Sequence, residues 1–175
     1  MGAQAAARSI LTIVGPTAAG KTAYAIEQAE RVDGEIVSVD SRQIYRGFVI
    51  GTGQPTPGEQ ARAPHHLINL LEPTERITAG RYVRLVHAAI ADIIDRGKTP
   101  ILCGGTGLYI RALRHGLAPQ GEAGPDLRRQ ILERIEAQGP EKLLAELARV
   151  DPEYAAKLHP NNIPRLARAL EIWEV

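Results

Sequence analysis

A glycine-rich stretch near the start of the chain has the residue types and the spacing of a phosphate-binding loop. The pattern G-x-x-x-x-G-K-[ST] is matched by Gly15-Pro16-Thr17-Ala18-Ala19-Gly20-Lys21-Thr22. Backbone N–H groups of such a loop converge on one anion, the lysine adds a mobile positive charge, and the threonine hydroxyl suits Mg²⁺. The stretch therefore predicts a phosphate site, with Thr22 as the residue that would hold the metal ion.

The segments beside this loop predict a strand before it and a helix after it. Residues 9–14 are short and rich in β-branched side chains, as is typical of a buried parallel strand. Residues 23–30 are rich in helix formers. This strand–loop–helix order is the context that the phosphate loop requires, and a glycine turn beside an accidental lysine is the less favoured alternative.

Two further polar clusters directly follow predicted strands. Residues 35–39 lead into Asp40, and residues 100–103 lead into a glycine turn that contains Thr106. A carboxylate beside pyrophosphate could act as a general base or hold a metal ion, although a turn or cap residue is the alternative for Asp40. The Thr106 hydroxyl could reach a phosphate oxygen, and an ordinary turn threonine is the alternative there.

Alternating strands and helices predict an α/β fold with a parallel sheet, in which ligands gather at the carboxyl ends of the strands. The three polar clusters should therefore line one edge of the sheet and face one crevice. We expect a three-layer core of the P-loop NTPase type over residues 1–115, with three strands. Residues 47–64 predict a loop, and Thr78 and Gly97 predict the two ends of a helix.

The remaining residues, 116–175, predict a helical insertion without strands. Helical patterns cover residues 126–138, 141–150, 152–158 and 162–175. The last pattern has no C-cap and a three-stranded sheet is small for this fold, so we expect the chain to be shorter than a natural parent. Arg165 and Arg168 could contact nucleic-acid phosphates from one helix face, although a solvated face is an equally good interpretation of their spacing.

Composition excludes some classes of protein and leaves others open. A chain of 175 residues with a formal net charge of +1 has no global nucleic-acid signature. The single cysteine, Cys103, is expected in the core; it excludes an internal disulfide and suits a reducing cytoplasm. No apolar run approaches the ~20 residues of a membrane span, so no membrane partner is expected. The adjacent His65 and His66 do not predict a metal site, because neighbours in an extended chain point in different directions.

Taken together, these segments resemble the tRNA dimethylallyltransferase family, also called tRNA isopentenyltransferases. The resemblance runs from about Ile10 to the end of the chain. Besides the phosphate loop, the matching stretches are Asp40-Ser41-Arg42-Gln43-Ile44-Tyr45-Arg46-Gly47, Ile50-Gly51-Thr52, Pro64-His65-His66-Leu67-Ile68, Gly104-Gly105-Thr106-Gly107-Leu108-Tyr109, His159-Pro160-Asn161-Asn162, Arg165 and Arg168-Ala169-Leu170-Glu171.

The resemblance implies transfer of a dimethylallyl group from its diphosphate to the exocyclic amine of an adenine. That adenine lies beside the anticodon of a tRNA, on its 3′ side. By resemblance, Asp40 is the general base, Thr106 binds the pyrophosphate near its bridging oxygen, and Lys21 with the loop amides and Mg²⁺ holds the pyrophosphate. The implied tRNA contacts are Asp40, Ser41, Arg42, Gln43, Thr106, Arg128, Pro164, Arg165, Leu166, Ala167 and Arg168. The full-length parent is expected to be a cytoplasmic monomer.

Other functions remain open at this point. An adenylate isopentenyltransferase would share the donor site but lack a helical tRNA-gripping insertion. A small-molecule kinase would bind ATP on the same loop, and a non-enzymatic module would bind phosphate only. The chain also differs from the usual family pattern, since Gly53-Gln54-Pro55 replaces Ala-Lys-Pro and Pro164 stands where a glutamine is common.

Overall fold

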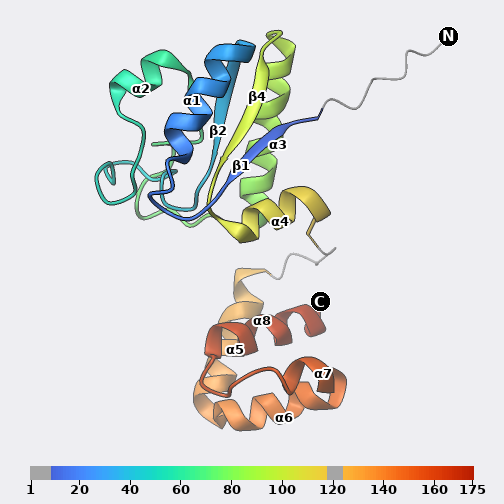
Figure 1. The fold of residues 1–175 in the computed structure, drawn as a ribbon. Helices are drawn as coiled ribbons and strands as arrows, with labels where there is room; N and C mark the ends of the chain where they lie inside the picture. Colours follow the sequence, from blue (N-terminus) through green and yellow to red (C-terminus); the bar gives the residue numbers. More distant parts are fainter. Residues whose placement is uncertain (1–8, 118–123) are drawn as a thin grey trace, which may run out of the picture. The chain divides into compact units, whose positions relative to one another are not determined.

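The chain folds into two compact units, Met1–Leu117 and Ala118–Val175. A computed structural model describes residues 9–117 and 124–175 (Figure 1). The sequence predicted a change of character at residue 116. None of the helices in the described ranges combines the length and the apolar character needed to cross a membrane.

The first unit contains a parallel sheet, which confirms the predicted α/β class. Its strands are β1 (Leu11–Val14), β2 (Gly34–Val39), β3 (His65–His66) and β4 (Thr99–Gly104), in the order β1-β4-β2-β3. The prediction of three strands was incomplete, because β3 pairs with Ile36 and Val37 of β2. Two histidines after a proline carry no strand signal of their own, so this strand exists only through its pairing with β2.

Helices cover both faces of the sheet, and the unit therefore has the expected three layers (Figure 1). Successive side chains of a strand point to opposite faces. Ile36 of β2 packs on the face that carries α1 (Lys21–Val32) and the end of α2 (Pro57–Arg62). Val37, its neighbour in the chain, packs with α3 (Ala79–Asp95) and α4 (Gly107–His115) on the other face.

The ends of the helices explain what the sequence did and did not predict. Thr78 caps α3 by accepting a hydrogen bond from the Arg81 amide, as expected. The prediction of a loop over residues 47–64 was wrong in part, because α2 lies within it. A capping box starts this helix: Thr56 accepts from the Glu59 amide, and the Glu59 carboxylate accepts from the Thr56 amide.

The second unit consists of helices around its own core. They are α5 (Pro125–Gln138), α6 (Pro140–Val150), α7 (Pro152–Ala155) and α8 (Ile163–Glu174). All four were predicted, although α7 ends earlier than the expected residue 158. The fully buried side chains of this second unit include Ile131, Leu143, Leu147, Leu166 and Leu170, none of which belongs to the hydrophobic clusters of the first unit.

Candidate active site

The three loops that the sequence predicted at one sheet edge are direct neighbours. A Cβ built on Gly105 would lie 3.1 Å from the carbonyl oxygen of Gly15 in the phosphate loop. The Thr106 amide donates to the Val39 carbonyl at 3.2 Å, and the Ser41 amide donates to Thr106 Oγ1 at 2.9 Å. The loops after β1, β2 and β4 therefore lie next to one another at one edge of the sheet.

Gly104 makes this approach possible. A Cβ on this residue would overlap the carbonyl group of Val39, which is backbone and cannot move aside. Val39 and Gly104 are register partners at the ends of β2 and β4. The missing side chain lets the two strands deliver Asp40 and Thr106 side by side.

The phosphate loop adopts a concave backbone suited to an anion. Ala18 and Gly20 both have left-handed conformations, with φ of 64° and 76°. Alternation of this kind turns successive N–H groups toward one point, and the first amides of α1 have no carbonyl ahead of them within the helix. Lys21 Nζ donates to the Pro16 carbonyl oxygen at 2.6 Å, which holds the ammonium group at the mouth of the loop.

Asp40 is a turn residue, which was the alternative that the sequence left open. Only one of its two carboxylate oxygens accepts hydrogen bonds from the turn. Its Oδ1 accepts hydrogen bonds from the amides of Arg42 at 2.8 Å and Gln43 at 3.3 Å. Its Oδ2 has no hydrogen-bond partner within the described part of the chain. The turn thus fixes the carboxylate, and the second oxygen stays available for a proton.

The thiol of Cys103 shows that Lys21 and Asp40 lie close to one point. Burial raises the pKa of Cys103, the charge of Lys21 lowers it, and the charge of Asp40 raises it. Since both charges act on this thiol, the Lys21 and Asp40 side chains lie near the same buried position. Cys103 itself is a free, buried thiol, as the sequence predicted.

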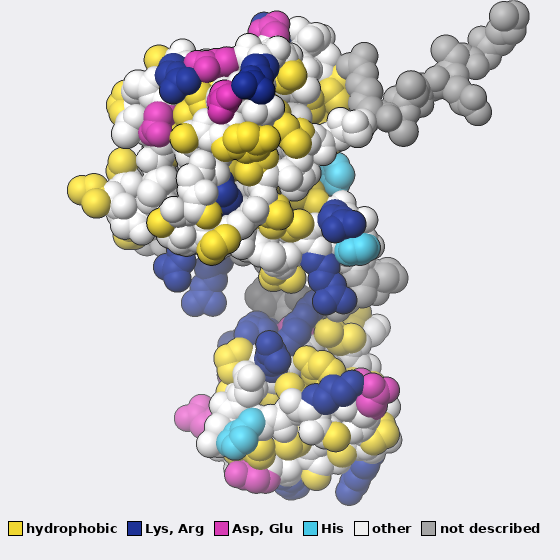
Figure 2. Space-filling view, viewed as in Figure 1, with side chains coloured by type: hydrophobic (Ala, Val, Ile, Leu, Met, Phe, Trp, Pro, Cys, Tyr) yellow, Lys and Arg dark blue, Asp and Glu magenta, His cyan; other side chains and the backbone are white. Residues whose placement is uncertain are grey.

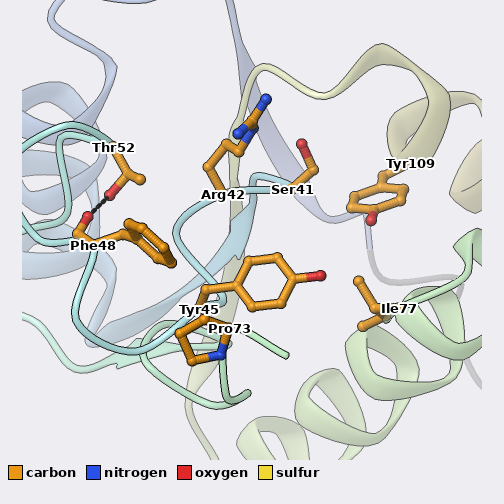
Figure 3. Close-up of a pocket in the computed structure, with 8 residues that line it drawn as sticks. All are labelled: Ser41, Arg42, Tyr45, Phe48, Thr52, Pro73, Ile77 and Tyr109. Carbon is orange, nitrogen blue, oxygen red and sulfur yellow. Dashed lines mark hydrogen bonds between the residues drawn. The ribbon is translucent and has the colours of Figure 1, made fainter. Parts of the chain in front are cut away.

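A pocket of about 520 Å³ borders the turn that follows Asp40 in the chain (Figure 3). Ser41, Arg42, Tyr45, Phe48, Thr52, Pro73, Ile77 and Tyr109 line it. Figure 3 shows the Tyr45 hydroxyl pointing across the pocket toward Ile77 and Tyr109. Tyr109 stacks on Tyr82, with ring centroids 3.9 Å apart, and burial raises the pKa of both phenols. The sequence did not predict this pocket. Tyr45 and Tyr109 lie in family-like stretches, whereas Pro73 and Ile77 carry no signal in the sequence.

Two glutamines fix the loop that borders this pocket. Gln43 Nε2 donates to the carbonyl oxygens of Thr52 and Gly53, and its Oε1 accepts from Ser38 Oγ at 2.9 Å. Gln54 is buried, and its Nε2 donates to the carbonyl oxygens of Gln43 and Tyr45. Gln54, which stands where the family usually has a lysine, is therefore a neutral buried residue that binds two carbonyl groups of the neighbouring loop.

Both histidines have hydrogen-bond partners within the first unit. His66 Nε2 lies 2.6 Å from Glu35 Oε2, and His65 Nδ1 lies 2.8 Å from the Ala63 carbonyl oxygen. Within residues 9–117 and 124–175, no group of three or more His, Cys, Asp and Glu side chains could enclose a metal ion. Thr22, half-buried in the first turn of α1, still fits Mg²⁺, because this ion keeps several waters and takes few protein ligands beside phosphate oxygens.

The helical unit brings together two of the arginines predicted to contact tRNA. Arg128 of α5 and Arg168 of α8 both bind the carboxylate of Glu171. Pro164 and Arg165 are exposed on α8. The side chains of Leu166 and Ala167 are fully buried in the core of this unit, so they support the helix and offer no side-chain surface to RNA.

Comparison with known proteins identifies the family. A family model described as IPP transferase matches residues 43–175. The chain belongs to the IPP transferase family. The resemblance found in the sequence is thereby confirmed.

Individual relatives agree with this assignment. A tRNA dimethylallyltransferase from Methylococcus capsulatus is 53% identical over 164 residues, which cover 94% of this chain and 53% of the relative. One from Sorangium cellulosum is 52% identical over 165 residues, covering 94% of this chain and 52% of the relative. The chain thus spans about half the length of the curated relatives it matches.

Two solved structures have the same fold. The tRNA isopentenylpyrophosphate transferase from Bacillus halodurans is 40% identical with a TM-score of 0.62, covering 95% of this chain and 55% of that one. A eukaryotic dimethylallyltransferase acting on tRNA is 32% identical with a TM-score of 0.81, covering 94% of this chain and 41% of that one. Both belong to the class of enzyme that the sequence suggested.

Proposed function

We propose that this protein transfers a dimethylallyl group from dimethylallyl diphosphate to the exocyclic amine of the tRNA adenine on the 3′ side of the anticodon. The observation that carries the proposal is the convergence of the phosphate loop, Asp40 and Thr106 at one sheet edge. Family membership and the relatives named as tRNA dimethylallyltransferases support the choice of donor and acceptor.

In the proposed reaction, the amine nitrogen of the adenine forms a bond with the first carbon of the dimethylallyl group. The bond from that carbon to the pyrophosphate oxygen breaks, and its electron pair leaves with the pyrophosphate. A neutral amine is a weak nucleophile, so Asp40 Oδ2 accepts the proton that the nitrogen loses. Oδ1 stays bound to the turn amides and keeps the carboxylate in place.

Departure of pyrophosphate requires that its developing negative charge be stabilised. The loop amides, Lys21 and the Thr106 hydroxyl donate hydrogen bonds toward this site in the proposal. Thr106 Oγ1 already accepts from Ser41, so its own proton remains to be donated to a phosphate oxygen. Thr22 would hold Mg²⁺, which neutralises part of the pyrophosphate charge when bound.

The aromatic pocket beside Asp40 suits a base that has left its stack. An enzyme that modifies a stacked base must extrude it, and aromatic side chains then bind its faces. Tyr45, Phe48 and Tyr109 supply such surfaces within the pocket. Ser41 and Arg42 line the same pocket and offer polar groups to the nucleotide.

The decisive experiment follows both binding and chemistry. We expect the chain to bind dimethylallyl diphosphate with Mg²⁺ in preference to ATP, and to bind an anticodon stem-loop. ATP binding without donor binding would favour a kinase instead. Transfer to free AMP without transfer to RNA would favour an adenylate isopentenyltransferase.

Asp40→Asn is the sharpest test of the proposed chemistry, because asparagine keeps an oxygen for the turn but cannot take the proton. Transfer should fall by about 10²–10⁴-fold while donor affinity is retained. Single-turnover transfer with protein in excess detects slow product formation, and the Methylococcus relative serves as the positive control. Activity within a few-fold of wild type would exclude Asp40 as the base.

A further inference from the structure

We infer that Glu171 is a positioning residue for RNA binding, which sets two arginines in the geometry of a phosphate-binding fork. The inference rests on the proposed function, because it assumes that the helical unit contacts tRNA. Glu171 touches no reacting group; it acts through Arg128 and Arg168. The family resemblance implied RNA contacts for both arginines but no role for the acid between them.

The carboxylate of Glu171 joins two helices at the surface of the unit. Its Oε1 accepts from Arg128 Nη1 of α5 at 2.5 Å, and its Oε2 accepts from Arg168 Nη1 of α8 at 2.9 Å. The Glu171 side chain is only 3% exposed, whereas those of Arg128 and Arg168 are 44% and 41% exposed. The acid therefore lies beneath two cationic groups that reach solvent.

Burial of this acid has a physical consequence for the arginines. A buried carboxylate is unfavourable unless it is paired, so Glu171 holds its partners firmly. Two guanidinium groups at one place also repel each other, and the carboxylate between them offsets this repulsion. The free protein thus keeps both arginines together and ordered before any RNA arrives.

The surroundings of the pair fit a polyanion. Figure 2 shows Lys and Arg side chains gathered over the part of the helical unit that carries α5 and α8. Guanidinium groups match the geometry of phosphate oxygens and form strong charge-assisted hydrogen bonds with them. Since ordering long side chains on binding weakens affinity, a pair that is already ordered binds more tightly. The fitting partner is therefore the phosphate backbone of the tRNA stem-loop.

The Glu171→Gln variant distinguishes a positioning role of Glu171 from a simple effect of its charge on RNA affinity. The substitution removes a negative charge beside the RNA, so electrostatics alone would tighten binding. Glutamine keeps one acceptor oxygen but places a donor NH₂ group against one guanidinium. If Glu171 positions the arginines, affinity for an anticodon stem-loop should fall by about ten-fold in spite of the added positive charge.

Glu174→Gln is the matched control on the same helix. It makes the same change of charge, and its partner Arg134 keeps a second bond to Glu146 at 2.7 Å. We expect this variant to bind RNA as well as or slightly better than wild type. Thermal melting followed by circular dichroism shows whether each variant is folded. If Glu171→Gln does not fold, Glu171→Asp keeps the charge, shortens the side chain and should weaken binding several-fold.

A double-mutant cycle tests whether Glu171 acts through Arg128. In the Arg128→Ala background, Glu171→Gln should have a clearly smaller effect on RNA affinity than in wild type. Equal or tighter binding by folded Glu171→Gln overturns the inference but leaves the proposed function intact. Failure of the wild-type chain to bind the stem-loop contradicts both, whereas donor binding measured alone still tests the phosphate loop.

Discussion

At the scale of single residues, Lys21 is the strongest test of the phosphate loop. Its hydrogen bond to the Pro16 carbonyl keeps the ammonium group where an anion would be bound. A charge-assisted hydrogen bond contributes about 1.5–3 kcal/mol. Lys21→Ala should therefore weaken the binding of dimethylallyl diphosphate by roughly 10–100-fold, as measured by titration calorimetry in the presence of Mg²⁺.

Lys98→Ala is the control for this prediction. Lys98 pairs with Asp33 at 2.6 Å. It directly precedes β4 and so lies at the amino end of that strand, whereas the phosphate loop follows the carboxyl end of the parallel strand β1. Its loss should leave donor affinity unchanged. If Lys21→Ala also binds the donor normally, the loop is not the donor site.

At the scale of elements, Glu35 ties three parts of the first unit together. It lies on β2, accepts two hydrogen bonds from Arg96 at the end of α3, and contacts His66 of β3. These bonds, chiefly those of Arg96, lower the pKa of Glu35 from 4.5 to about 2. A carboxyl group with a lowered folded-state pKa stabilises the fold above its unfolded pKa and loses this contribution as pH falls.

The stabilising effect of Glu35 should therefore disappear in acid. The difference in unfolding free energy between wild type and Glu35→Gln should shrink by about 2 kcal/mol between pH 6 and pH 3. Urea denaturation at fixed pH measures this difference. Glu72→Gln, which alters an exposed ion pair with Arg46, should show little change over the same range. A constant difference for Glu35→Gln would contradict the role assigned to this residue.

The sequence predicted those elements whose signals are local. Thr78 and Gly97 mark the ends of α3, and short, largely apolar runs mark the three longer strands. The capping box of Thr56 and Glu59 is a local signal as well, but it lies in a segment rich in glycine and proline that was predicted as a loop, so α2 was missed. β3 could not be predicted in this way, because its two histidines become a strand only beside β2.

The same distinction between local signals and contacts formed only on folding holds for the candidate site. The meeting of Asp40 and Thr106 was predictable, because carboxyl ends of parallel strands share one edge. The aromatic pocket was not, because Tyr45 and Ile77 come from separate segments that meet only on folding. Burial of Leu166 depends likewise on packing against other helices, which the family-like stretch around it did not show.

At the scale of the whole molecule, the two units have separate cores and should unfold separately. The chain has one tryptophan, Trp173, and it lies on α8. Tryptophan fluorescence should therefore follow the helical unit, while calorimetry follows both. Dimethylallyl diphosphate with Mg²⁺ should raise the melting temperature of the first unit only, because a ligand stabilises the fold that binds it.

The ligand expected to stabilise the helical unit is the anticodon stem-loop. It should raise the temperature of the unfolding transition that Trp173 fluorescence reports. A single transition that both methods detect, and that the donor shifts as a whole, would show that the units are not independent. A donor-induced shift in the fluorescence transition alone would show that the donor binds the helical unit, which would contradict the proposed donor site.

The hydrogen bond from the Ser41 amide to Thr106 Oγ1 has a consequence for the order of events in the reaction. In the proposed reaction, this one hydroxyl links the loop that faces the leaving group to the loop that carries the base. When a pyrophosphate oxygen accepts a hydrogen bond from the Thr106 hydroxyl, the oxygen atom of Thr106 becomes a better acceptor for the Ser41 amide, since hydrogen bonds in a chain strengthen one another. Donor binding should then tighten the Asp40 turn before the acceptor arrives. For the proposed reaction we expect synergy between the substrates in steady-state kinetics, with dimethylallyl diphosphate binding first and the RNA second.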